Sequence, residues 1–266
     1  MTTLNDNKVA LSIVVDRSGS MDMMNPKEIC GSLNSLIADQ VATGKEILVW
    51  FSTFDDKYET PHRGVPGKNV SITEDQITPR GLTALYDAMQ YAISDLGYDL
   101  RGMTDRPGKV IMVILTDGEE NSSTQATRSQ VMDMVTEQRS TYSWEFIFLG
   151  ANQDAIGNGA DIGIDQHTSC DFDYSPAGCG AVLRTTSNAI NRTLTGETPQ
   201  VEFTNEERLE SQLLNTNDGD YYDEKQSDND DVYNGSEESQ YFNPPRRMNG
   251  ISPQRTNGNP HVSFAL

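Results

Sequence analysis

The chain has 266 residues, of which 20 are Lys or Arg and 40 are Asp or Glu, so its formal net charge is −20. Two acidic residues for each basic one argue against a protein that binds nucleic acid through its phosphates or docks on an anionic membrane. The three cysteines form neither a CxxC pair nor an even set, which disfavours a zinc ribbon and a disulfide-stapled scaffold. The sequence shows neither a membrane-spanning apolar run nor a signal peptide, so we expect a soluble cytoplasmic protein.

Short apolar runs alternate with segments of helical periodicity along about the first 200 residues. The first run, 9–15, is apolar at nearly every position, which is typical of a strand buried on both faces. Segment 58–60 is expected to pair back on the strand before it through a tight turn. The predicted strands are 9–15, 46–54, 58–60, 110–115, 144–149 and 168–172, and the predicted helices are 26–44, 84–96, 131–135, 153–161 and 178–194.

Strands separated by helices predict an α/β fold, with a doubly wound, mainly parallel sheet and helices on both faces. We expect one such Rossmann-like domain over residues 7–196. In this architecture ligands bind beyond the carboxyl ends of the strands, so polar residues at those ends are the first candidates for a site.

Residues 197–266 differ from the domain in composition, because Asn, Asp, Ser, Gly and Gln dominate after Phe203. They hold 14 of the 40 acidic residues and 5 of the 20 basic ones. Such a segment buries too little apolar surface to offset the entropy of ordering it. We therefore expect an acidic, mostly disordered tail, with a possible short helix over 206–214. Both a solubilising role and a recognition role are open for it.

Two predicted strands end in acidic residues. Asp16 closes the first strand, and Ser18 and Ser20 follow at alternate positions. Asp117 follows the 110–115 strand, so it is expected at the same edge of the sheet as Asp16. Thr83 precedes a helix and is expected near that edge too. Two carboxylates and three hydroxyls are an all-oxygen set that suits a hard cation such as Mg²⁺ or Mn²⁺, whereas the lack of His and Cys disfavours zinc.

This set resembles the metal-ion-dependent adhesion site (MIDAS) of the von Willebrand factor type A (vWA) domain. The family's pattern is DxSxS after the first strand, a Thr in a later loop and an Asp after the fourth strand. All five positions are matched here, by Asp16, Ser18, Ser20, Thr83 and Asp117. Segments 81–88 and 115–118 also look like the family's usual sequences, and the resemblance covers roughly residues 7–165, extending toward 196.

The resemblance implies a non-enzymatic binding module. In the family, these side chains hold Mg²⁺ or Mn²⁺, and a partner protein completes the coordination with an Asp or Glu. Relatives act in adhesion or as adaptors of ATPases. A single domain with an acidic tail is more similar to the bacterial and viral members than to the extracellular ones.

Several neighbouring residues have two open interpretations. Segment 119–121 is either a rim that selects partners or, as we favour, a solvated acidic loop. Arg17 and Arg80 flank the proposed site, where they could steer a carboxylate or simply be exposed. Asp87 is expected to interact with the dipole of its own helix, and segment 152–154 to cap a helix rather than to line a groove.

Two other functions compete with metal-dependent protein binding. A Mg²⁺-dependent phosphohydrolase could use Asp16 as nucleophile, but the position two residues later, where a general acid is expected, is Ser18, and the chain has no GxxxxGK[ST] motif. A structural or decoy protein could act through its acidic surface or tail, but the tail has no long unbroken acidic run.

Overall fold

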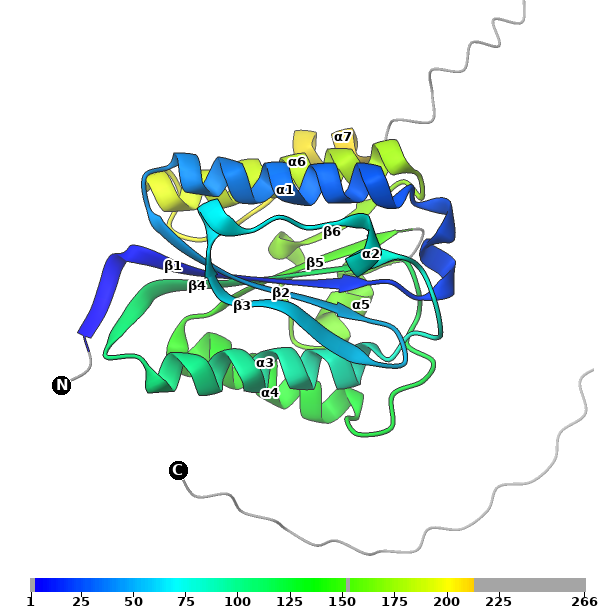
Figure 1. Cartoon of the computed structure of the whole chain (residues 1–266), viewed down its shortest axis with the longest axis horizontal. Coiled ribbons are helices and arrows are strands. Elements are labelled where there is room, and N and C mark those ends of the chain that lie inside the picture. Colours follow the sequence, from blue (N-terminus) through cyan, green and yellow to red (C-terminus); the bar gives the residue numbers. More distant parts are fainter. Residues whose placement is uncertain (1–2, 152–153, 213–266) are drawn as a thin grey trace, which may run out of the picture. The chain divides into compact units, whose positions relative to one another are not determined.

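A computed structural model gives the structure of residues 3–151 and 154–212. Six strands form one sheet in the order β3-β2-β1-β4-β5-β6, in which β3 is antiparallel to β2 and the other pairs are parallel (Figure 1). Their bounds are β1 Thr3–Asp16, β2 Glu46–Phe54, β3 Tyr58–Pro66, β4 Asp105–Thr116, β5 Glu145–Ala151 and β6 Ser169–Phe172. The predicted mainly parallel sheet and the hairpin after β2 are confirmed.

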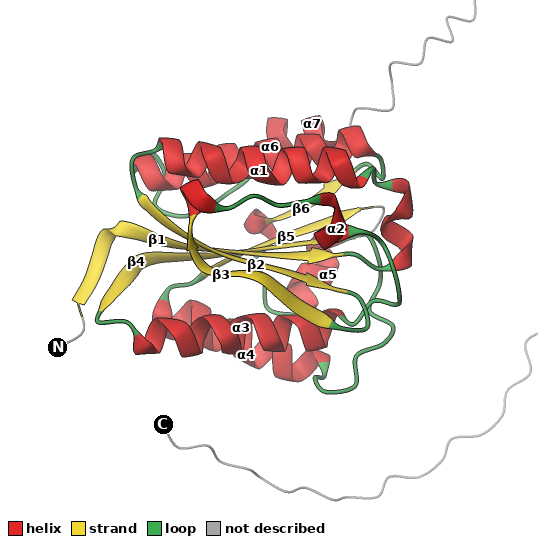
Figure 2. Cartoon of the chain, viewed as in Figure 1, coloured by secondary structure: helices red, strands yellow, loops and turns green. Residues whose placement is uncertain are grey.

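Helices cover both faces of this sheet (Figure 2). One face carries α1, α2, α6 and α7, and the other carries α3, α4 and α5. Their bounds are α1 Pro26–Ala42, α2 Glu74–Ile77, α3 Leu85–Gly102, α4 Arg128–Tyr142, α5 Ala155–Asp161, α6 Pro176–Thr195 and α7 Asn205–Gln212. Three short 3₁₀ helices, η1 Gly19–Met23, η2 Gly67–Asn69 and η3 Gln166–Thr168, lie in the connections.

The central strand β1 shows why the fold has two cores. Successive side chains of a strand point to opposite faces. Leu11, Ile13 and Val15 therefore pack against α1 and α6, whereas Ala10 and Val14 pack against α3 and its neighbours. Because both faces are covered, the strand must be apolar at nearly every position, as the sequence predicted.

Two strands are longer than their apolar runs. β1 begins at Thr3 and β4 at Asp105, and these two residues are paired in register. Lys8 holds the extension together, since its Nζ lies 2.7 Å from an Asp105 carboxylate oxygen and 3.4 Å from a Glu46 carboxylate oxygen. A polar extension of this kind has no hydrophobic pattern that would reveal it.

The fold also continues beyond the predicted boundary at residue 196, so that boundary is wrong. Val201 and Phe203 are buried in the core, and α7 packs against α6 and β6. Within α7, Glu207 is 8% exposed and forms two hydrogen bonds with the Arg192 guanidinium, at 2.6 and 2.8 Å. The expected short helix near 206–214 is therefore present. Residues 213–266 lie outside the described part of the chain, and their disorder stays a prediction.

Glu207→Ala is expected to lower the free energy of unfolding by about 1.5–3 kcal/mol, the usual range for hydrogen bonds to a charged group. The substitution removes both bonds to Arg192 and the bond from the Thr204 backbone N–H. Urea unfolding measures the effect. Glu210→Ala is the matched control, because Glu210 sits on the same helix in an exposed pair with Arg184.

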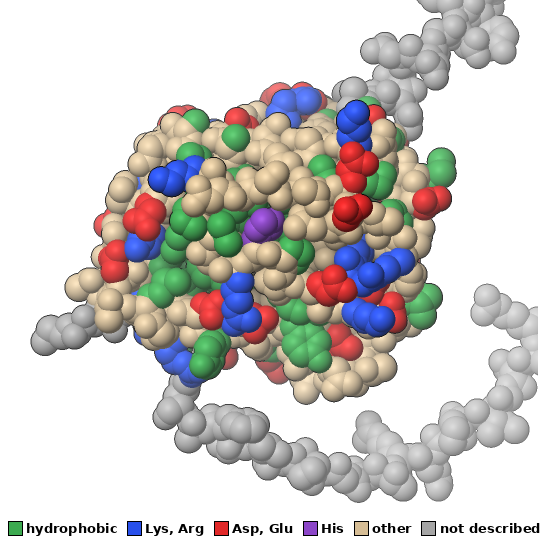
Figure 3. Space-filling model, in the orientation of Figure 1, with side chains coloured by type: hydrophobic (Ala, Val, Ile, Leu, Met, Phe, Trp, Pro, Cys, Tyr) green, Lys and Arg blue, Asp and Glu red, His purple; other side chains and the backbone are tan. Residues whose placement is uncertain are grey.

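Acidic and basic side chains are intermixed on the face shown in Figure 3. The ion pairs include Arg63 with Asp99 at 2.7 Å and Arg80 with Glu59 at 2.5 Å.

No helix among residues 3–151 and 154–212 has both the length and the apolar character needed to cross a membrane. The three cysteines are buried and unpaired.

Candidate metal centre

The carboxyl edge of the sheet gathers three loops that are joined by backbone hydrogen bonds. Arg17 N–H donates to the Phe54 carbonyl at 2.8 Å, which joins the ends of β1 and β2. Gly19 N–H donates to the Gly81 carbonyl at 3.1 Å, and Arg80 N–H to the Arg17 carbonyl at 2.7 Å. The loop that carries Ser18 and Ser20 is thus fixed against the loop that carries Thr83.

Asp16 lies at the bottom of this edge and is 1% exposed. Its Oδ1 accepts a hydrogen bond from Ser18 N–H and its Oδ2 one from the Thr116 hydroxyl, both at 2.7 Å. Burial raises the pKa of Asp16 to about 6, although these hydrogen bonds favour the charged form; the negative charge of Asp117 raises it slightly further. The carboxylate is oriented from two sides and electrostatically uncompensated.

A chain of hydroxyls links the two strand ends. The Ser20 hydroxyl donates to Asp117 Oδ1 at 2.8 Å, and it lies 2.9 Å from the Ser18 hydroxyl. Because Ser20 has one proton and gives it to Asp117, Ser18 is the donor in the second bond. Thr83 is 2% exposed, and a Cβ added to Gly118 would lie 3.0 Å from its Oγ1 and 3.3 Å from Ser20 Oγ. The structure therefore brings all five predicted residues to one place.

The remaining oxygen of Asp117 is the observation that tests a metal at this place. Its Oδ2 is buried and has no hydrogen-bond partner among the described residues. Burial raises the pKa of Asp117, with partial relief from hydrogen bonding, first by the Ser20 hydroxyl and more weakly by the Tyr174 hydroxyl. A buried carboxylate oxygen without a partner is costly, and a cation relieves that cost. The described residues contain no group of three or more His, Cys, Asp or Glu that could hold a metal ion. The oxygens gathered here are those of two carboxylates and three hydroxyls, a donor set that fits a hard cation.

Tyr174 is a residue of the site that the sequence analysis missed. It lies between β6 and α6, and its hydroxyl donates to the Ser20 backbone carbonyl. Burial raises the pKa of Tyr174, and the negative charge of Asp117 raises it further. The sequence signal that could have identified Tyr174 is its position two residues after the end of β6, at the same edge of the sheet as Asp16 and Asp117.

The acidic loop after Asp117 is ordered by its own side chains, in contrast to the expected solvated loop. Glu120 accepts hydrogen bonds from the Ser122 and Ser123 backbone N–H groups, at 2.9 and 2.7 Å, and from Tyr86 N–H at 3.0 Å. Asn121 Oδ1 accepts from Thr83 N–H at 3.0 Å. Within the predicted segment 119–121, Glu119 and Asn121 are exposed as expected, whereas Glu120 is half-buried.

Asp87 has a larger role than interaction with its helix dipole. Its carboxylate accepts hydrogen bonds from the backbone N–H groups of Thr124, Gln125 and Ala126, at 2.9, 2.8 and 2.7 Å. It therefore anchors the far end of the loop that begins at Asp117.

We expect Asp87→Ala to destabilise the protein by about 2–4 kcal/mol, since one buried and two partly buried backbone donors lose a charged acceptor. Hydrogen exchange of the Thr124 to Ala126 amides, followed by mass spectrometry, measures the loosening directly. Asp133→Ala, an exposed acid on α4, serves as the control. Unchanged exchange in Asp87→Ala would contradict the anchoring role.

The two arginines beside the site are engaged in ion pairs. Arg17 is 3% exposed, and its Nε lies 3.0 Å from Asp55 Oδ2, which Arg80 Nε also contacts at 2.6 Å. Glu59 pairs with both guanidinium groups. Asp154 caps α5 by accepting from Gly157 N–H, as expected, whereas positions 152–153 lie outside the described residues.

No protein-family model and no curated protein matches the sequence. Among solved structures, the chain is similar to proximal thread matrix protein 1 from the mussel byssus, in a structure with a zinc-occupied MIDAS motif, with a TM-score of 0.53 and 14% identity. It is also similar to the pilus adhesin SpaC of Lactobacillus rhamnosus GG, with a TM-score of 0.55 and 16% identity. The PilB minor pilin of Streptococcus sanguinis gives a TM-score of 0.51 and 12% identity.

The chain has the vWA fold. These comparisons cover 69%, 73% and 70% of it, and 46%, 32% and 62% of the mussel protein, SpaC and PilB respectively. The chain therefore corresponds to one part of each of these longer proteins. At such identities the likeness concerns the fold alone, so the role of the five residues rests on their own geometry.

Proposed function

We propose that this vWA-fold protein captures a partner protein through a divalent cation held by Asp16, Ser18, Ser20, Thr83 and Asp117. The observation that carries the proposal is the buried, unpartnered Oδ2 of Asp117 at the end of the hydroxyl chain from Ser18 and Ser20. A bound Mg²⁺ or Mn²⁺ would supply a positive charge with an open position for a carboxylate of the partner.

The protein's own residues prepare this place for a cation. Asp16 and Asp117 supply two negative charges, while the three hydroxyls supply oxygens without adding charge. Because only two of the five ligands are charged, a cation bound here stays electron-poor, which favours an incoming Asp or Glu. The mussel protein named above, whose MIDAS motif holds zinc, supports metal binding at this part of the fold, and the adhesin supports a binding role.

The phosphohydrolase hypothesis is weaker on this geometry. Both oxygens of Asp16 accept hydrogen bonds from the protein, from Ser18 N–H and Thr116 Oγ1, and the side chain is 1% exposed. A nucleophile must reach the reacting atom of a substrate, and a side chain buried this deeply presents no oxygen to one. We therefore propose a non-enzymatic module, and we place it in the cytoplasm because its composition and three unpaired cysteines suit a reducing compartment.

A pull-down from lysate of the source cells tests the proposal. The bait is wild type or Asp16→Ala/Asp117→Ala, each with Mg²⁺ and with EDTA. We expect a partner that is retained only by wild type in Mg²⁺. The matched control is Asp22→Ala, which removes an exposed acid from η1 next to the site. A partner retained equally in all lanes would overturn the proposal and move binding to another face.

A further inference from the structure

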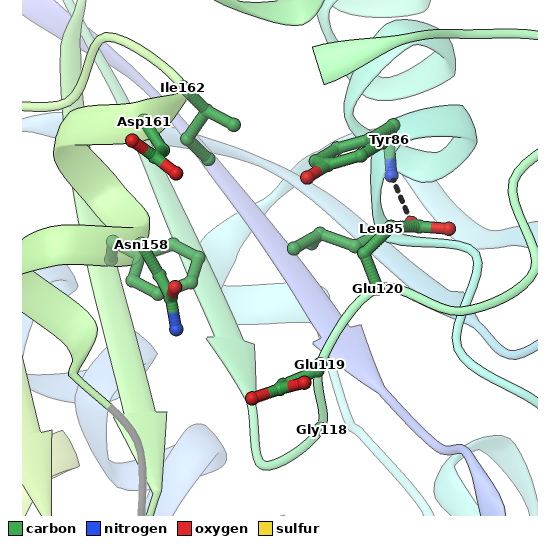
Figure 4. A pocket seen from close by; sticks show the side chains of 9 residues that line it. Leu85, Tyr86, Gly118, Glu119, Glu120, Asn158, Asp161 and Ile162 are labelled. Atoms are coloured by element: carbon green, nitrogen blue, oxygen red, sulfur yellow. Dashed lines mark hydrogen bonds between the residues drawn. The ribbon is translucent and has the colours of Figure 1, made fainter. Parts of the chain in front are cut away.

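A pocket of about 280 Å³ opens beside the candidate metal centre, between the start of α3, the loop after β4 and α5. Figure 4 shows Asn158, Asp161 and Ile162 on one side of it, Tyr86 and Leu85 on the other, and Glu119 between them at one end. Leu85, Phe148 and Ile162 form its apolar wall. The pocket thus combines an apolar wall with a polar and largely acidic lining.

The polar groups make the pocket negative. Glu120 is bound to backbone N–H groups, and Asp161 is paired with Arg128 at 2.5 Å, but no hydrogen bond or ion pair of Glu119 is recorded among the described residues. Burial raises the pKa of the Tyr86 hydroxyl, and the charges of Glu120 and Asp161 raise it further. Glu119 is therefore an acid available to an incoming cation.

The pocket and the metal centre share a wall. Gly118 lines the pocket, and a Cβ at this position would lie 3.0 Å from Thr83 Oγ1 and 3.3 Å from Ser20 Oγ. Glu119 follows directly in the chain, so one loop presents Asp117 to the metal centre and Glu119 to the pocket. A partner that reaches the first therefore lies over the second.

We propose that the pocket receives a Lys or Arg side chain of the same partner that supplies the carboxylate. This inference rests on the proposed function and specifies the partner: it presents an acidic and a basic side chain close together. The apolar wall suits the aliphatic stem of the basic side chain and Glu119 suits its charged head. The volume is below that of sites for drug-sized molecules, which favours a single side chain as the occupant.

The first test isolates the pocket from the metal. N-acetyl-arginine methylamide is titrated into ¹⁵N-labelled protein in EDTA, and the neutral N-acetyl-citrulline methylamide is the matched probe. We expect saturable shifts of the Glu119, Asn158 and Asp161 amides with the arginine probe alone, and their loss in Glu119→Gln but not in Glu137→Gln, an exposed acid on α4. Equal shifts with both probes, or none, would overturn the inference.

The second test joins the pocket to the proposed function. Each peptide of a series has one Glu in an Ala/Ser background and one Arg, placed at a different position within four residues of the Glu. A matched series carries citrulline in place of Arg. Binding of both series is measured in Mg²⁺ and in EDTA. At one spacing we expect Arg peptides to bind at least about tenfold more tightly than citrulline peptides, or about 1.4 kcal/mol, and this ratio to approach one in Glu119→Gln. Metal-dependent binding with no preference for Arg overturns the inference alone. Arg-dependent binding that EDTA leaves unchanged overturns the proposed function instead.

Discussion

Asp117→Ala is expected to weaken Mn²⁺ binding by at least about 100-fold, more than the 10–100-fold loss typical of removing a group that only supports a ligand. The substitution removes one of two carboxylates at the centre and the acceptor of the Ser20 hydroxyl. It also removes the buried Oδ2 that has no partner among the described residues, so the fold itself loses little. Electron paramagnetic resonance of free Mn²⁺ during titration measures the affinity.

Two comparisons make this result specific. Asp22→Ala removes an exposed acid of η1 and keeps the centre, so its affinity is expected to equal that of wild type. Urea unfolding of both variants checks that they fold. If Asp117→Ala binds Mn²⁺ as well as wild type, the five residues are not a metal centre.

Asp55→Ala is expected to lower the free energy of unfolding by about 3–5 kcal/mol, the usual cost of removing one member of a buried ion pair. Asp55 is fully buried, and its carboxylate contacts Arg17 at 3.0 Å and Arg80 at 2.6 Å. Arg80 is half exposed and can turn to water, but Arg17 is 3% exposed and stays buried with only the exposed Glu59 as a charged partner. Thermal or urea unfolding measures the loss.

Asp95→Ala is the surface counterpart, because Asp95 pairs with Arg63 at 3.2 Å and both side chains are more than a third exposed. We expect about 0–1 kcal/mol for it. Equal losses in the two variants would show that the Asp55 pair contributes no more than a surface pair.

The Asp55 pair also predicts a pH dependence. Hydrogen bonding and charge from Arg80 and Arg17 outweigh burial and hold the pKa of Asp55 below its ordinary value of 3.8. The unfolded chain therefore binds the proton more tightly than the fold does, so the stabilisation is present above pH 3.8 and is lost as the pH falls below it. The difference in unfolding free energy between wild type and Asp55→Ala should shrink in the same direction.

The main elements of the fold could be predicted because both faces of the parallel strands are buried. That requirement leaves a nearly continuous apolar run such as 9–15, which a sequence reveals directly. The five residues of the centre could also be predicted as neighbours, since parallel strands bring their carboxyl ends to one edge.

Other features depend on contacts that leave no periodic signal. Lys8 and Asp105 extend two strands by a salt bridge, and Glu207 fixes α7 through Arg192. Asp87 and Glu120 look like ordinary acids in sequence, but each accepts three or more backbone or hydroxyl hydrogen bonds because of the path the loop takes. These roles follow from tertiary structure and are invisible to spacing.

The backbone ties among the loops at the sheet edge have a kinetic consequence. Gly19 is hydrogen-bonded to Gly81, and Thr83 is hydrogen-bonded to Asn121, and neither bond involves a ligand. A partner that binds as we propose would dock on loops that are already in place, and no ordering step would slow its arrival. We expect association at the ordinary rate of about 10⁵–10⁷ M⁻¹s⁻¹ for docking of preformed surfaces. Differences between partners should then appear almost wholly in how long each complex lasts.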